Sequence, residues 1–271
     1  MAILSIIQET LQPLYREIEA NYTLQQTAAF TSRLWYVPYI SCVLYLLAVY
    51  LGTRWMSTRS PYSFRPLLVL WNFVLTIVSM MGAYVMVPEL YRYFTERGYV
   101  ASVCTSAIHL QPMLSFWSLI FVLSKIFEFG DTFFIIVRKT PLRFLHWYHH
   151  VTVCIISWYS LSIKSTAAHW YCAMNLSVHS IMYSYYFLKA LQVTMPTVVA
   201  TAITLLQLLQ FVLGFAVTLV ATQQYVSGEP CFTDTWLCIL GLTIYGSYFL
   251  LFCKFFCDKY LKKPTKKTKE Q

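Results

Sequence analysis

The chain has 271 residues, of which 58% are hydrophobic and only 11% are charged, and its formal net charge is +9. Soluble globular proteins carry about 25% charged residues, so this composition excludes that class. Several apolar stretches exceed the ~18 residues that cross a hydrocarbon core. The sequence therefore predicts an all-α polytopic membrane protein.

Hydropathy and helix breakers together predict about seven transmembrane helices. The predicted spans are 34–53, 67–87, 115–137, 142–162, 167–188, 198–222 and 236–256. Pro88 is expected to mark the edge of the second span, because proline interrupts helical hydrogen bonding. The chain then divides into a short N-terminal segment at 1–33, a membrane domain at 34–256 and a basic tail at 257–271.

Lysine and arginine are concentrated in alternate loops, and such loops are expected to be cytosolic. The cytosolic side would hold the basic tail and a set of loop residues: Arg54, Arg59, Arg65, Arg138, Lys139, Arg143 and Lys189. The opposite loops hold few basic residues and most of the acidic ones. This predicts a lumenal N-terminus and a cytosolic C-terminus. The net positive charge is then explained by topology, and we expect no nucleic-acid partner.

Two short motifs agree with this orientation. Asn21-Tyr22-Thr23 fits the glycosylation acceptor pattern on the predicted lumenal side, at Asn21. Lys267 and Lys269 lie fifth and third from the C-terminus and resemble a dilysine retrieval signal, which favours the endoplasmic reticulum membrane. The alternative interpretation of these lysines is an ordinary basic tail beside the membrane.

The chain has eight cysteines, and most of them fall within predicted spans, where they are small apolar residues. Cys104 and Cys231 lie instead in the two longest lumenal loops. Because the lumen is oxidising, we predict a disulfide between them.

Three predicted spans carry polar residues at helical spacing, which is costly in a membrane and typical of a functional site. Stripes of this kind also act as hydrogen-bonding contacts between helices. Lys125 and Glu128, three residues apart on one helix, could instead pair with each other. The polar residues are Lys125, Glu128, Asp131 and Thr132 in 115–137, Asn175, His179, Tyr183 and Tyr186 in 167–188, and Thr204, Gln207 and Gln210 in 198–222.

His146, His149 and His150 form an HxxHH cluster at the start of 142–162, and their spacing places them on one helix face. At 1.5 Å per residue, His149, His179, Glu128, Asp131 and Gln207 all lie roughly 9 to 13 Å from the cytosolic ends of their spans. This common depth predicts one polar chamber that opens toward the cytosol. His109 and His169 lie in a lumenal loop and at a lumenal span end, and we assign them no role.

HxxHH clusters also bind metals, because imidazole is a common metal ligand. Membrane di-iron enzymes use about eight or more histidines in several clusters, whereas this chain has six histidines and one cluster. Three histidines with His179 form an alternative zinc site. We expect no metal.

The four polar patterns together resemble the signature motifs of the ELO-type very-long-chain fatty acid elongases, which are membrane 3-ketoacyl-CoA synthases. The resemblance covers about residues 34–260, with the motifs in family order on successive spans. The local sequence from Pro141 to His150 looks most like the branch that extends saturated and monounsaturated C12–C18 acyl chains. The motifs read Lys125-x-x-Glu128-x-x-Asp131-Thr132, His146-x-x-His149-His150, His179-x-x-Met182-Tyr183-x-Tyr185-Tyr186 and Thr204-x-x-Gln207-x-x-Gln210.

The resemblance implies that six helices form a ring around an acyl tunnel, with one further span outside it. It implies condensation of a long-chain acyl-CoA with malonyl-CoA to give 3-ketoacyl-CoA, carbon dioxide and CoA, without a cofactor. It also makes membrane lipid, other enzymes of the elongation cycle and a second copy of the chain expected partners. The alternative from another class is a seven-span transporter or receptor that uses the polar level as a substrate or proton path.

Roles for the residues follow from this chemistry. A neutral imidazole attacks a thioester to form an acyl-imidazole, and the family mechanism points to His149, with His146 and His150 orienting it or moving protons. His179 and Asn175 would stabilise the enolate oxygen formed from malonyl-CoA.

The remaining polar residues are expected to support this machinery. Glu128 and Asp131 would set the histidine tautomers, with Lys125 balancing their charge, and Gln207 and Gln210 would bind the CoA arm or the histidines. Basic residues at the cytosolic mouth would bind CoA phosphates or only anchor the chain at the membrane surface: Arg138, Lys139, Arg143 and Lys189.

Overall fold

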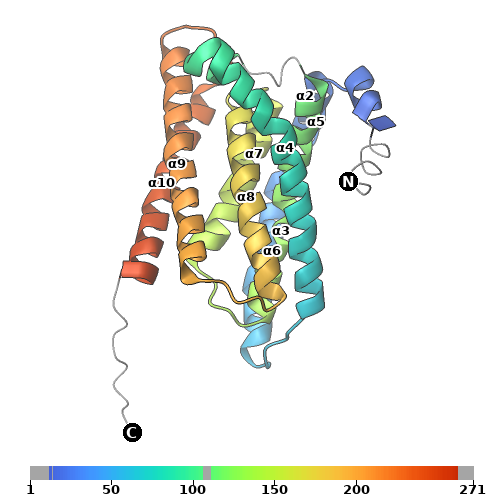
Figure 1. Cartoon of the computed structure of the whole chain (residues 1–271), viewed down its shortest axis with the longest axis vertical. Helices are drawn as coiled ribbons and strands as arrows, with labels where there is room; N and C mark the ends of the chain where they lie inside the picture. Colours follow the sequence, from blue (N-terminus) through green and yellow to red (C-terminus); the bar gives the residue numbers. More distant parts are fainter. Residues whose placement is uncertain (1–11, 14, 106–110, 262–271) are drawn as a thin grey trace.

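The computed structural model describes residues 12–13, 15–105 and 111–261, and this part of the chain is helical with no strand. His109, Lys267 and Lys269 lie outside the described residues. The principal helices are α2 (Leu24–Arg33), α3 (Val37–Ser57), α4 (Arg65–Cys104), α5 (Pro112–Phe127), α6 (Gly130–Val137), α7 (Phe144–Ser162), α8 (Ala168–Ala190), α9 (Thr197–Val226) and α10 (Thr235–Phe256) (Figure 1).

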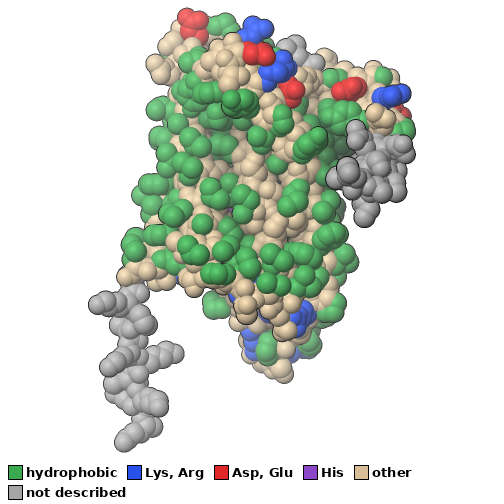
Figure 2. Space-filling model, viewed as in Figure 1, with side chains coloured by type: hydrophobic (Ala, Val, Ile, Leu, Met, Phe, Trp, Pro, Cys, Tyr) green, Lys and Arg blue, Asp and Glu red, His purple; other side chains and the backbone are tan. Residues whose placement is uncertain are grey.

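Among the described residues, four helices are long and apolar enough to cross a membrane: α3, α4, α9, and α10 with the π-helical turn that extends it to Leu261. The predicted spans at 115–137, 142–162 and 167–188 correspond to α5 with α6, α7 and α8, which carry most of the polar motif residues. The total of seven spans therefore stays a prediction. Apolar side chains cover the middle of the molecule, and charged ones lie at its two ends (Figure 2).

Exposed tryptophans flank α3. Trp35 is 64% exposed just before the helix and Trp55 is 50% exposed near its end, which places them about 30 Å apart along a helix. That length matches a hydrocarbon core of about 30 Å, and tryptophan favours the membrane–water interface. The polar residue Tyr45 lies midway between them.

Among the described residues, six helical segments contact one another in a closed ring in the order α4, α5, α7, α10, α9, α8 and back to α4. Consecutive segments alternate in direction (Figure 1). α3 packs outside this ring against α6 and α7, and α2 packs against α5 and α7. The order of contacts matches the ring of six helices with one helix outside it that the resemblance implies, and the acyl tunnel stays a prediction.

α2 was not expected from the sequence, which predicts only a short N-terminal segment there. Thr23 and Gln26 form a capping box, in which each side chain accepts a hydrogen bond from the other's backbone N–H. The helix is held in place from α7, because Nε1 of Trp158 donates to the carbonyl oxygen of Thr31 across 2.8 Å. Asn21 lies exposed just before this helix.

Pro88, predicted to mark the edge of the second span, does not end the helix, because α4 continues through Pro88 to Cys104. Neighbouring groups in membrane proteins often compensate for the hydrogen bond that proline removes. The helix axis instead changes at Gly98, whose φ of 80° lies in the left-handed region that glycine adopts without steric cost.

The predicted disulfide is present, with the sulfur atoms of Cys104 and Cys231 joined. It ties the end of α4 to the loop between α9 and α10. Ala167 and Val217 pack in the same cluster as Cys104, and the backbone N–H of Thr166 donates to the carbonyl oxygen of Phe232. Four connected segments therefore meet at this end of the bundle.

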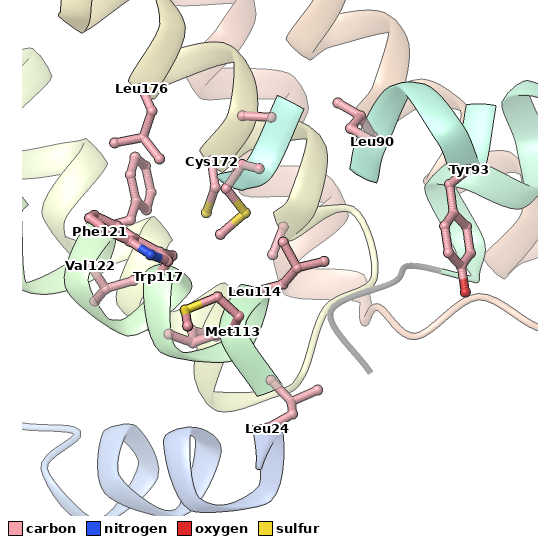
Figure 3. Packing of buried hydrophobic residues seen from close by; sticks show 14 of the residues in the cluster. Leu24, Leu90, Tyr93, Met113, Leu114, Trp117, Phe121, Val122, Cys172 and Leu176 are labelled. Atoms are coloured by element: carbon pink, nitrogen blue, oxygen red, sulfur yellow. The ribbon is translucent and has the colours of Figure 1, made fainter. Parts of the chain in front are cut away.

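The largest core cluster lies at the junction of α2, α4, α5, α7 and α8. Figure 3 shows Trp117 and Phe121 of α5 beside Leu176 and Cys172 of α8, with Leu24 of α2 at the edge. This packing fixes α5 against α8, and so fixes the relative positions of the polar residues that follow on both helices.

Candidate active site

A cavity of about 830 Å³ opens at the end of the bundle where α4 begins and α8 ends. Its walls come from α4, α6, α7, α8, α9 and α10. The structure brings most of the predicted polar residues together on these walls: Glu128, Asp131, His146, His149, His150, Asn175, His179, Tyr183, Tyr186, Gln207 and Gln210. The cavity is not lined by Lys125, Thr132 or Thr204, all of which are buried. Lys125 and Thr132 lie directly behind its walls, and Thr204 lies in α9.

The span predicted at 115–137 is not one helix. It breaks at Glu128 and Phe129 into α5 and α6. Beside the break, a Cβ atom on Gly130 would lie 2.4 Å from Cζ2 of Trp71, so only glycine admits the indole ring at this point. The break places Glu128 at the end of α5 and Asp131 in the first turn of α6, both beside the cavity.

Lys125 joins two walls of the site. Its Nζ donates to Oε1 of Glu128 and to Oδ1 of Asn175, each across 2.7 Å. Both Lys125 and Glu128 are almost fully buried, so the ion pair predicted from their spacing forms away from water. A buried ion pair needs such additional hydrogen bonds to offset its desolvation.

The same chain of contacts fixes His179. Because Asn175 uses Oδ1 to accept from Lys125, its amide nitrogen faces Nε2 of His179, at 3.2 Å. An amide nitrogen only donates, so Nε2 accepts and the proton of a neutral His179 resides on Nδ1. Nδ1 lies 3.7 Å from Oε1 of Glu128, beyond ordinary hydrogen-bonding distance.

Asp131 does not orient a histidine, contrary to the prediction. Its Oδ1 accepts from Nε1 of Trp71 and its Oδ2 accepts from the hydroxyl of Tyr183, each across 2.7 Å. These bonds join α4, α6 and α8 at one carboxylate. Trp71 could not be selected from the sequence, since an aromatic residue in an apolar span usually belongs to the packing.

The α6 residue that contacts the histidine cluster is Thr132. Its Oγ1 lies 2.9 Å from Nε2 of His146 and 2.8 Å from the hydroxyl of Tyr45 on α3. The external helix α3 thus reaches the site through one tyrosine. The HxxHH spacing correctly places the three histidines together, with 4.5 Å between the ring centroids of His146 and His150 and 5.8 Å between those of His149 and His150.

A second, smaller cavity of about 60 Å³ continues from the first. His149, Asn175, Gln210 and Phe211 line both. On α7 its lining runs from His149 to Leu161, about 18 Å of helix, toward the end of the bundle that carries the disulfide. Its walls are mostly apolar. His149 therefore stands where a polar chamber meets an apolar pocket.

The predicted mouth residues separate into two groups. Arg138, Arg143 and Lys189 line the first cavity together with Arg65, which was not among the predicted binding residues. Lys139 does not line it; its Nζ donates to the carbonyl oxygen of Ser57 across 3.3 Å. Anchoring at the end of the bundle is therefore the better interpretation for Lys139.

The remaining polar residues have mainly structural contacts. Thr204 donates to the carbonyl oxygen of Ala200, and His169, given no role, is fully buried with Nε2 2.9 Å from the carbonyl oxygen of Met86. In the described ranges no group of three or more His, Cys, Asp or Glu side chains is arranged to hold a metal ion.

These features define a helical membrane protein with a histidine-lined chamber inside a ring of helices. A model of the ELO family, GNS1/SUR4, matches residues 30–268, and the chain belongs to this family. Its curated relatives include very long chain fatty acid elongase 6 of Drosophila melanogaster, 38% identical over 90% of this chain and 78% of the relative. Very long chain fatty acid elongase 6 of Gallus gallus is 35% identical over 99% of this chain and 98% of its own. Very long chain fatty acid elongase 3 of Mus musculus is 37% identical over 89% of this chain and 88% of its own.

Proposed function

We propose that this chain acts in fatty acid elongation as the condensing enzyme, a 3-ketoacyl-CoA synthase. The reaction joins a long-chain acyl-CoA to malonyl-CoA and releases carbon dioxide and CoA. The observation that carries the proposal is the position of His149 at the junction of a polar chamber with a basic mouth and an apolar pocket. The family membership and the names of the relatives support it.

In the first half-reaction, the acyl-CoA thioester lies across this junction. Nδ1 of His149 is fully buried, so Nε2 is the nitrogen that attacks the thioester carbon. The carbon–sulfur bond breaks, the acyl group stays on the imidazole, and CoA leaves as a thiolate that takes up a proton. His146 and His150 are the neighbouring groups for that proton, because neutral imidazole both donates and accepts.

In the second half-reaction, malonyl-CoA occupies the polar chamber and loses carbon dioxide. The resulting enolate carbon attacks the acyl carbon, the carbon–nitrogen bond breaks, and His149 is regenerated. The enolate oxygen needs a donor fixed in advance. Nδ1–H of His179 has this role in our proposal, since the Lys125–Asn175 chain sets its tautomer.

The two ends of the substrate have separate binding regions. Arg65, Arg138, Arg143 and Lys189 supply positive charge for the CoA phosphates, and the apolar pocket accepts the acyl chain. A cavity of about 60 Å³ has room for only a few water molecules. The helices around it must therefore move apart when an acyl chain enters. The sequence around the histidine cluster favours C12–C18 acyl substrates.

The cellular setting is proposed on the same grounds. In our proposal the mouth faces the cytosolic side of the endoplasmic reticulum membrane and the N-terminus is lumenal, which the basic loops support. The Cys104–Cys231 bond and exposed Asn21 support a lumenal position for the opposite end. A homodimer and contact with the other enzymes of the elongation cycle are proposed from the family resemblance.

The test is carbon dioxide release from labelled malonyl-CoA by the purified protein in lipid vesicles. Release should require added acyl-CoA and should disappear in His149→Ala. Intact-mass measurement with acyl-CoA alone should show one acyl group on the wild-type chain and none on this variant. A wild-type protein that moves solute across the vesicle membrane but releases no carbon dioxide would instead favour the transporter class.

A further inference from the structure

The ring of Tyr248 lies directly on the imidazole of His149, with ring centroids 4.8 Å apart and planes inclined at 56°. Tyr248 belongs to α10, which carries none of the four motifs. We propose that Tyr248 is the positioning residue that holds the His149 imidazole in its reactive orientation. This inference rests on the proposed function, because it presumes that His149 accepts the acyl group.

Within the part of the chain that the structure describes, His149 makes no side-chain hydrogen bond that would orient its ring. Nδ1 is buried without a hydrogen-bond partner among the described residues. His146 and His179, in contrast, are fixed by Thr132 and Asn175. A histidine ring that lacks such a bond turns within a broad torsional well. Packing against neighbouring rings is then what limits its rotation, and Tyr248 is the closest aromatic side chain.

Tyr248 is itself anchored to the turn of α7 that carries the nucleophile. Its hydroxyl is hydrogen-bonded to Oγ1 of Thr152 and lies 3.3 Å from the carbonyl oxygen of His149. Thr152 in turn donates to the carbonyl oxygen of Tyr148 across 2.6 Å. The tyrosine ring is therefore fixed relative to the backbone of His149, although it comes from another helix.

The rest of the tyrosine is enclosed. Tyr248 is 3% exposed, and its ring packs against Phe211 at 5.3 Å and Tyr148 at 5.9 Å between centroids. It lines the apolar pocket but not the polar chamber, whereas His149 lines both. The tyrosine thus forms the wall behind the imidazole on the acyl side, which keeps the ring turned toward the junction where the thioester would lie.

The functional consequence is kinetic. A reacting nitrogen misplaced by about 1 Å costs roughly 100-fold in rate, even where the change is outside the reacting atoms. Removing the ring should therefore slow acyl transfer to His149 without weakening substrate binding to the mouth. Removing only the hydroxyl should have a smaller effect, because the ring remains enclosed.

The decisive measurement is single-turnover acylation by palmitoyl-CoA, followed by intact mass, beside equilibrium binding of a non-hydrolysable thioether analogue of palmitoyl-CoA. Tyr248→Leu should acylate about 100-fold more slowly and bind the analogue with an affinity within a few-fold of wild type. Tyr248→Phe should recover most of the rate. Phe249→Leu is the matched control, because Phe249 is the next residue and faces outward.

A second set of variants tests the anchor without removing the ring. Tyr248→Phe and Thr152→Val break the same hydrogen bond, so each should slow acylation to a similar, several-fold extent. The double variant should be no slower than either one. This set keeps the inference testable where Tyr248→Leu fails to fold.

The outcomes distinguish a failure of the acyl-histidine mechanism from a failure of the positioning role of Tyr248 alone. A wild-type chain that elongates but never carries an acyl group contradicts the acyl-histidine mechanism itself. An acylated wild type with equally fast acylation in Tyr248→Leu contradicts the positioning role alone. Fully additive effects of Thr152→Val and Tyr248→Phe would also contradict it, since the two changes would then act independently.

Discussion

Nε1 of Trp71 donates a hydrogen bond to Oδ1 of Asp131 across 2.7 Å, and this bond ties α4 to the break between α5 and α6. Tyr183 closes the other side of the same carboxylate. The two carboxylates of the motif thus differ in their surroundings: Glu128 is paired with a cation, whereas Asp131 is held by neutral donors.

Trp71→Phe removes one of these donors and keeps an aromatic ring. We expect a loss of about 1 to 3 kcal/mol in stability, because a partly buried carboxylate oxygen loses its partner. Thermal unfolding of the purified protein in detergent would measure it. Trp35→Phe, at a 64% exposed position, should change stability by no more than about 0.5 kcal/mol. Equal effects of the two variants would contradict the structural role of Trp71.

Gly130→Ala should destabilise the protein even though alanine normally favours helix. The added methyl would approach Cζ2 of Trp71 to 2.4 Å, so the indole must move and its bond to Asp131 must stretch. Gly246→Ala offers the matched control, because its Cβ would lie 3.8 Å from Phe215, an ordinary contact. There alanine should be neutral or stabilise by about 0.5 to 1 kcal/mol. A melting temperature for Gly130→Ala at or above that of wild type would contradict the close packing of Trp71 on Gly130.

Breaking the Lys125–Glu128 pair from one side should be more damaging than replacing both residues. Glu128→Gln leaves a buried ammonium without its anion, and such a change costs about 3 to 5 kcal/mol. The double variant Lys125→Met, Glu128→Gln should recover part of that loss. Additive losses would argue against direct pairing. Glu96→Gln serves as the control, because Glu96 and Arg92 are about half exposed and exposed pairs contribute at most about 1 kcal/mol.

Thr132→Val keeps the shape of the side chain but removes the hydroxyl that faces His146 and Tyr45. One lost hydrogen bond of about 1 kcal/mol predicts a fall in the elongation rate of about fivefold. The rate should be compared with that of Thr243→Val, an exposed threonine whose hydroxyl bonds only to its own helix. Matching rates for the two variants would remove Thr132 from the site.

Replacing both Cys104 and Cys231 by serine should lower the thermal stability and abolish the difference in migration between non-reducing and reducing gels. The bridge closes a separation of 127 residues, for which the chain-entropy model gives at most about 5 kcal/mol. The actual loss should be smaller in a membrane, where inserted helices already restrict the unfolded chain. Cys257→Ser, at an exposed free cysteine, should change neither property. Rapid alkylation of both thiols in the native wild type would contradict the bridge.

Much of the lining of the cavity could be predicted from the sequence, because polar residues are informative in membrane helices. HxxHH spacing defines one face of α7, and the common depth of His149, His179 and Glu128 correctly brought three helices to one cavity. The prediction failed where helices meet. Asp131 has the spacing of a residue that faces the histidines, but its partners are Trp71 and Tyr183, and spacing along one helix does not specify which neighbour it faces.

The missed elements have similar causes. Tyr45, Trp71 and Tyr248 are aromatic residues in apolar helices, where the sequence does not separate a site residue from a packing residue. Beside the break at Glu128 and Phe129, Gly130 packs against the indole of Trp71, and this partner lies far away in the sequence. α2 was predictable in principle, because Thr23 and Gln26 have the spacing of a capping box.

The order of helices around the ring also has a consequence for biosynthesis. α10 is made last and completes the ring by contacting both α7 and α9. The ribosome therefore delivers all four motifs to the membrane before Tyr248 arrives beside His149. A nascent chain that stops after α9 has every motif residue but lacks the α10 side chain that packs on His149, the proposed nucleophile. Insertion of the final helix is thus the step at which the chain changes from a set of inserted segments into an enclosed reaction chamber.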